Sequence, residues 1–159
     1  MNEALEQKIN KIIDSRDDTP VIFKVILKKE LSIESQEEIL DLVHIRREHS
    51  DSGRKSSDFA KSVLLVATTY GLMVVEEGMN DTHLEYGGYR IRHMMYSKIK
   101  SLDFNSCLLI GQLRAVTVSP SEPDLMVEFN SSKYYQDIAA IVDIIRGKMI
   151  ELERRAYTR

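Results

Sequence analysis

The chain has 159 residues, with 22 basic and 25 acidic side chains and a formal net charge of −3. This length is that of one domain, and the 43% hydrophobic content is that of a globular protein. Proteins that hold duplex nucleic acid neutralise its phosphates with a basic excess, which this composition lacks. We therefore expect no nucleic-acid partner.

Cysteine usage and hydropathy predict the compartment. The single cysteine, Cys107, excludes an intramolecular disulfide and a four-thiolate zinc site, and its apolar neighbours predict a small buried side chain. No apolar run reaches the roughly 20 residues that cross a bilayer, and the acidic first residues do not resemble a signal peptide. These features predict a cytoplasmic protein without a transmembrane segment.

Residues 1–35 are predicted to form a helical N-terminal extension. The apolar residues of its first helix recur at helical spacing: Leu5, Ile9, Ile12 and Ile13. Thr19 and Pro20 have the pattern of an N-cap followed by proline at the first helical position, which favours a second helix over residues 21–31. The apolar run that follows also fits a buried strand. The stripe of the first helix needs a partner surface, either on the rest of the chain or on a second copy, and we expect it to contribute to self-association.

Residues 36–152 are predicted to form a domain of about seven short strands and one helix. The strand-like runs are rich in β-branched and aliphatic residues, at 39–46, 63–68, 72–76, 89–95, 98–104, 113–118 and 125–130. Most of the connections are too short for a parallel crossover, so the strands are expected to be antiparallel. Gly71 ends one of the turns, where glycine can supply a positive φ.

The last element is predicted to be an amphipathic helix capped by Ser131 or Ser132. Its apolar stripe comprises Tyr134, Ile138, Ile141, Ile145, Met149 and Leu152. A stripe of this length must be buried, so we expect Ile141 and Ile145 to pack on the sheet. Gly147 can end the helix early, and the remaining residues, 153–159, are expected to form a flexible basic tail.

Three stretches carry a resemblance to a known family. They are the strand–threonine turn–strand sequence over 64–75, the tyrosine–lysine–isoleucine segment over 95–102, and the apolar-glycine sequence over 108–111. Together with the order of strands and helix, these stretches resemble bacterial pleckstrin-homology-like domains. The resemblance implies an α+β fold, in which a partly open barrel of about seven antiparallel strands is capped by a C-terminal helix. Tyr70 and Gly71 depart from the pattern, because bacterial members usually carry a basic residue at this turn.

The resemblance also implies a candidate ligand site in the first interstrand loop, where eukaryotic relatives hold inositol phosphates with basic residues. The corresponding candidates here are Arg46, Arg47, Arg54, Lys55 and Lys61. A phosphate site needs several cations that converge on one anion. Because Glu48, Asp51 and Asp58 are interleaved with these bases, we expect little binding to anionic membranes.

The sequence contains no pattern typical of a catalytic centre. The four histidines lack the spacing of zinc ligands, and Gly87-Gly88 is not followed by the helix of a phosphate loop. No catalytic residue, metal or cofactor is predicted. The favoured hypothesis is a non-enzymatic interaction or assembly module that binds a protein partner or itself. The alternatives are a binder of anionic lipid or phosphate that uses the first loop, and an enzyme with an unrecognised site.

Overall fold

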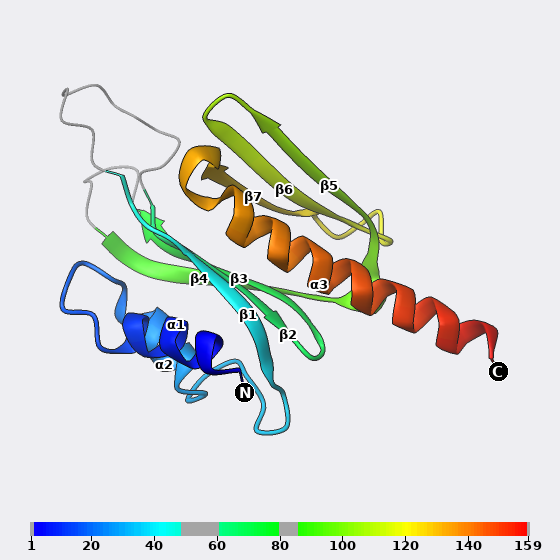
Figure 1. Ribbon diagram of the computed structural model, residues 1–159, viewed down its shortest axis with the longest axis horizontal. Coiled ribbons are helices and arrows are strands. Elements are labelled where there is room, and N and C mark those ends of the chain that lie inside the picture. The colour runs from blue at the N-terminus through cyan, green and yellow to red at the C-terminus, as the bar shows by residue number, and fades with distance from the viewer. Residues whose placement is uncertain (1, 49–60, 80–85, 159) are drawn as a thin grey trace.

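The computed structural model describes residues 2–48, 61–79 and 86–158. Two short helices come first, seven strands follow in two antiparallel sheets, and a long helix ends the chain (Figure 1). The expected α+β fold, with seven antiparallel strands and a C-terminal helix, is confirmed. No helix in the described part of the chain is long and apolar enough to cross a membrane.

The strands divide into two meanders. The first sheet has the order β1-β2-β3-β4 and contains β1 (Ile39–Ile45), β2 (Val63–Thr68), β3 (Gly71–Met79) and β4 (Tyr86–Met95). The second has the order β5-β6-β7 and contains β5 (Ile99–Cys107), β6 (Ile110–Thr117) and β7 (Leu125–Asn130). One turn of 3₁₀ helix, η1 (Tyr96–Lys98), joins the two sheets. Within each sheet, every strand pairs antiparallel with the next one along the chain, so no crossover connection is needed.

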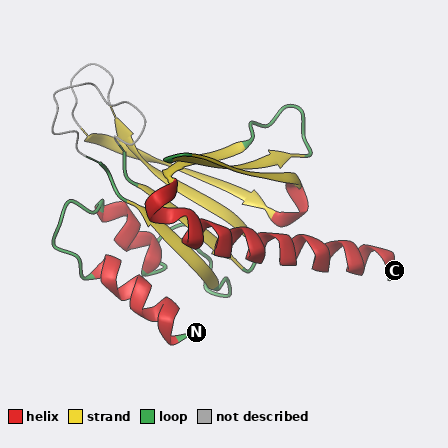
Figure 2. Ribbon diagram, turned by 45° about the horizontal axis from the view of Figure 1, so that its top comes forward, coloured by secondary structure: helices red, strands yellow, loops and turns green. Residues whose placement is uncertain are grey.

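The main core lies between the two sheets and the final helix, α3 (Ser131–Tyr157). Ile138, Ile141 and Ile145 are fully buried there against residues of both sheets, which confirms the predicted packing of the last helix. Phe129 of β7 is also fully buried, and its ring lies where a side chain on Gly111 would be. Figure 2 shows α3 extending past the sheets at its C-terminal end.

Both predicted ends of this helix were wrong. The N-cap is Asn130, whose side chain accepts a hydrogen bond from the Ser132 amide at 3.0 Å, so Ser131 is already helical. At the other end, α3 continues through Gly147 to Tyr157, and most of the expected tail, 153–159, is helical. One glycine costs a helix only about 1 kcal/mol, which packing before it and charge pairs after it can offset.

The N-terminal helices cover the face of the four-stranded sheet that points away from α3. They are α1 (Glu3–Ile13) and α2 (Val21–Leu27). The predicted stripe of α1 is buried in a second core with residues of α2 and of strands β1 to β3. The partner surface of this stripe is therefore the chain's own sheet, and not a second copy as expected from the sequence. The second helix, predicted over 21–31, ends at Leu27, and Pro20 occupies its N-cap rather than its first turn.

Candidate functional site

The predicted basic residues do not converge on one point in the described part of the chain. Arg46 pairs with Asp17 at 3.1 Å, and its side chain is half exposed. Arg47 is buried and binds both carboxylate oxygens of Glu77, with one nitrogen–oxygen distance of 2.6 Å. Lys61 is exposed. Arg54 and Lys55 lie outside the described residues.

The Arg47–Glu77 pair joins the end of β1 to β3. The Ser62 amide donates to Glu77 at 3.3 Å, and the Arg47 amide donates to the Ser62 hydroxyl at the same distance. A buried arginine with a bidentate carboxylate partner is already neutralised, so it has little positive charge to offer an anionic ligand. Arg47 therefore has a structural role at the mouth of the first loop.

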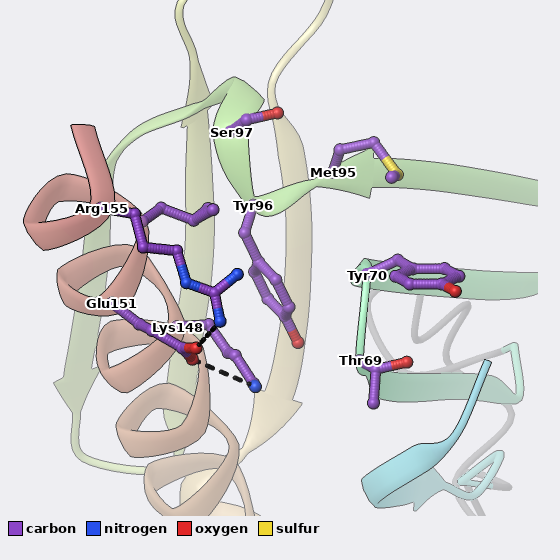
Figure 3. A pocket seen from close by; sticks show the side chains of 9 residues that line it. Thr69, Tyr70, Met95, Tyr96, Ser97, Lys148, Glu151 and Arg155 are labelled. Atoms are coloured by element: carbon purple, nitrogen blue, oxygen red, sulfur yellow. Dashed lines mark hydrogen bonds and ion pairs between the residues drawn. The ribbon is translucent and has the colours of Figure 1, made fainter. Parts of the chain in front are cut away.

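A hollow of about 350 Å³ lies elsewhere, between the β2–β3 turn, the β4–η1 corner and the C-terminal turns of α3 (Figure 3). We call it the tyrosine hollow, and its lining residues are Thr69, Tyr70, Met95, Tyr96, Ser97, Lys148, Glu151, Leu152 and Arg155. Its first five residues belong to the two longer segments that carry the family resemblance. Those segments are separated in sequence by residues 76–94, and the fold brings them together beside α3.

The Thr68 hydroxyl organises the turn on one side of this hollow. It accepts hydrogen bonds from the Tyr70 and Gly71 amides, each at 3.2 Å, and it contacts the buried Glu37 carboxylate. Gly71 does not have the positive φ that the turn predicted. Glycine is required for space instead, because a Cβ there would lie 2.4 Å from the carbonyl oxygen of Met94 on β4.

Tyr96 forms the base of the tyrosine hollow and is almost fully buried. Its hydroxyl donates to the Thr68 carbonyl at 2.7 Å, and its amide donates to the Tyr70 carbonyl at 3.3 Å. Burial raises the pKa of the Tyr96 phenol, and the Glu37 carboxylate raises it further. The phenol therefore remains protonated, and its hydrogen bond holds the β4–η1 corner against the β2–β3 turn.

The rim of the tyrosine hollow is apolar on one side and charged on the other. Tyr70, Met95 and Leu152 are 41%, 49% and 38% exposed. Glu151 accepts from Lys148 at 3.3 Å and also pairs with Arg155 (Figure 3). The hydrogen bond from Lys148 and the charges of both cations lower the pKa of the Glu151 carboxyl. Two cations with one anion leave one net positive charge beside exposed apolar surface.

The three charged residues of this rim were missed from sequence. Lys148, Glu151 and Arg155 follow each other at i, i+3 and i+7, so they share one helix face, and that spacing was the available signal. Their position opposite Tyr70 depends on how α3 crosses the sheets.

Cys107, predicted to be buried, is exposed at the end of β5.

The described histidine, cysteine and acidic side chains form no group of three or more that could hold a metal ion. His44 on β1 packs edge-on against Phe23, with ring centroids 5.4 Å apart. Burial, and secondarily the charge of Arg46, lowers its pKa to about 4, which makes it a neutral packing residue at ordinary pH.

Comparisons with protein-family models, curated proteins and solved structures gave no match for this chain.

Proposed function

We propose that this chain is a non-enzymatic interaction module of the pleckstrin-homology-like family, which binds a protein partner through the tyrosine hollow. Four strands, then three, and a terminal helix follow the layout that the resemblance implies. The two longer resembling segments also meet at this hollow. We also propose that the protein is cytoplasmic, as expected from the sequence.

The rim of the hollow is the observation that carries the proposal. It sets exposed Tyr70, Met95 and Leu152 beside Lys148 and Arg155. Aromatic residues, methionine and arginine are enriched where proteins bury surface against each other, and such residues supply most of the binding energy. A partner segment with an apolar side chain next to a carboxylate fits this arrangement. The apolar group would lie on Tyr70 and Leu152, and the carboxylate would face the cations.

The alternative hypothesis, binding of an anionic lipid or phosphate through the first interstrand loop, has weaker support than the protein-partner hypothesis. Its described candidates Arg46 and Arg47 are paired with Asp17 and Glu77, and the net charge of the chain is negative. Paired and interleaved charges attract a phosphate surface only marginally. It therefore ranks second and is tested separately below.

The test is affinity capture from the cell of origin with quantitative mass spectrometry. Baits are the wild-type chain, Tyr70→Ala, Arg155→Glu and the control Tyr157→Ala. Tyr157 is 92% exposed near the end of the same helix and does not line the hollow. We expect at least one protein to be retained by the wild type and by the control and to be lost with both hollow variants. Thermal melting of each bait checks that the fold is intact. Identical capture by all four baits would refute the assignment of the hollow.

A further inference from the structure

Strand β5 forms an outer edge of the three-stranded sheet. Among the described strands its hydrogen-bonded neighbour is β6 alone. An edge strand of nine residues presents a row of amide and carbonyl groups that another strand can pair with. On the α3 side of this edge, Leu102 and Phe104 are half-buried, and the Phe104 ring stacks on Tyr135 with centroids 5.1 Å apart.

The β5–β6 hairpin ends in an exposed apolar tip. Leu108, Leu109 and Ile110 are 92%, 61% and 52% exposed. Leu108 has a φ of 54° at the first position of a two-residue turn, where glycine is the usual residue. Ser131 at the start of α3 holds the turn, because its hydroxyl donates to the Leu108 carbonyl at 2.6 Å and its amide donates to the Leu109 carbonyl at 2.9 Å. A leucine kept in a strained and exposed position indicates a use for its side chain.

A second hollow lies beside the other end of the same strand. It has a volume of about 310 Å³ and is lined by Leu102, Val142, Arg146, Met149, Ile150 and Glu153. We call it the α3–β5 hollow. Its walls are aliphatic, and its two charged residues have opposite signs, so it suits an uncharged apolar side chain. The chain thus carries an apolar projection and an apolar recess on one strand edge.

We propose that two copies of this chain pair antiparallel through β5 about a two-fold axis, so that each hairpin tip covers the α3–β5 hollow of the other copy. Asn105 lies midway between Leu102 and Leu108, so the axis passes through Asn105. When this register is continued past the end of β5, the turn at Leu108 of one copy lies opposite Leu102 of the other, which lines the α3–β5 hollow. An isologous interface of this kind uses each tip and each hollow once.

A second copy paired in this register sets no like charges opposite each other among residues 102–108. With Asn105 on the axis, Asp103 lies opposite Cys107 of the second copy, and two Asn105 amides meet that can each donate and accept. An axis at Asp103 would set two carboxylates opposite each other, which destabilises a strand pair. The proposal uses a surface other than the tyrosine hollow, so either proposal can fail without the other.

The first test is sedimentation velocity of the full chain across a wide concentration range. The wild type is expected to pass from monomer to dimer. Leu108→Gly removes the projecting side chain and supplies the residue that a positive φ favours, so its fold is retained. We expect this variant to raise the dimer dissociation constant about tenfold or more. A wild type that stays monomeric at every concentration overturns the proposal, as does an unchanged dissociation constant for a folded Leu108→Gly variant.

The second test checks the register with a disulfide. In Asp103→Cys, the new thiol faces Cys107 of the second copy, with Cα atoms about 4.5 to 5.5 Å apart, which lies within the disulfide range. The two thiols of one copy are roughly 13 Å apart along the strand and cannot bridge. Met126→Cys, a 43% exposed position on β7, gives the same number of thiols and serves as the control. Mild oxidation is expected to convert Asp103→Cys, but not Met126→Cys, to a covalent dimer. Equal cross-linking of the two variants overturns the β5 pairing.

Discussion

His44 should make the stability of this protein fall as the pH is lowered from neutral. In the folded chain its pKa is about 4, and in the unfolded chain it returns to the ordinary value of 6.5. Between these values the unfolded state binds more protons than the folded state, so the free energy of unfolding decreases as the pH falls. The side chain packs against Phe23, and within the described residues its Nε2 atom has no hydrogen-bond partner. Protonation would therefore place an unpaired charge in a largely apolar environment.

The size of the effect follows from the two pKa values. Lowering the pH from 7.5 to 5 should remove about 2 kcal/mol of the free energy of unfolding, and the full shift corresponds to about 3 kcal/mol. Asp17 and Asp124, whose carboxyl pKa values are lowered by hydrogen bonds, lose their contributions at lower pH, below this window. Asp17 and Asp18 raise the pKa of His44, but burial and Arg46 outweigh them.

The assay is urea denaturation of the wild type, His44→Phe and His93→Phe at several pH values between 5 and 7.5. Phenylalanine keeps a ring against Phe23 but cannot take up a proton. His93, exposed on β4, receives the same substitution as a control. We expect His44→Phe to lose most of the pH dependence and His93→Phe to retain it. If all three proteins show the same slope of stability against pH, the reasoning is refuted.

Three further predictions concern packing, helix propensity and ligand. Gly71→Ala should lower the free energy of unfolding, measured by urea denaturation, by about 1 to 3 kcal/mol, because its Cβ meets the Met94 carbonyl. Gly147→Ala, in open space on α3, should raise it by about 0.5 to 1 kcal/mol. Equal effects of the two substitutions would contradict the close approach of Gly71 to β4. Ile141→Asp should lower the free energy of unfolding by several kcal/mol and abolish the cooperative thermal transition, because it buries a carboxylate among aliphatic side chains. A melting temperature within a few degrees of wild type would contradict the assignment of Ile141 to the core. The chain should not co-sediment at physiological salt with vesicles that contain phosphatidylglycerol or phosphoinositides. If it does co-sediment, and the double substitution Arg54→Glu with Lys55→Glu abolishes this, the anionic-lipid hypothesis is favoured instead.

Most of the helices and strands, and the faces that they bury, could be predicted from the sequence. The stripe through Ile138, Ile141 and Ile145 predicted an amphipathic helix, and alternating and aliphatic runs predicted seven strands, because both patterns repeat over a few residues. Short connections then required antiparallel pairing. These features depend on neighbours in the chain, so they can be read without knowledge of the fold.

The pairing of distant residues and the surfaces that stay exposed could not be predicted from the sequence. Arg47 pairs with Glu77, 30 residues away, and no local pattern in the sequence indicates this pairing. Tyr70 and Tyr96 meet because β3 pairs with β4, and Arg155 lies beside them because α3 crosses next to the β2–β3 turn. Cys107 has apolar neighbours in sequence but lies at an exposed strand end. The free energies of such contacts come from packing and charge between segments far apart in the chain, and local periodicity carries no information about them.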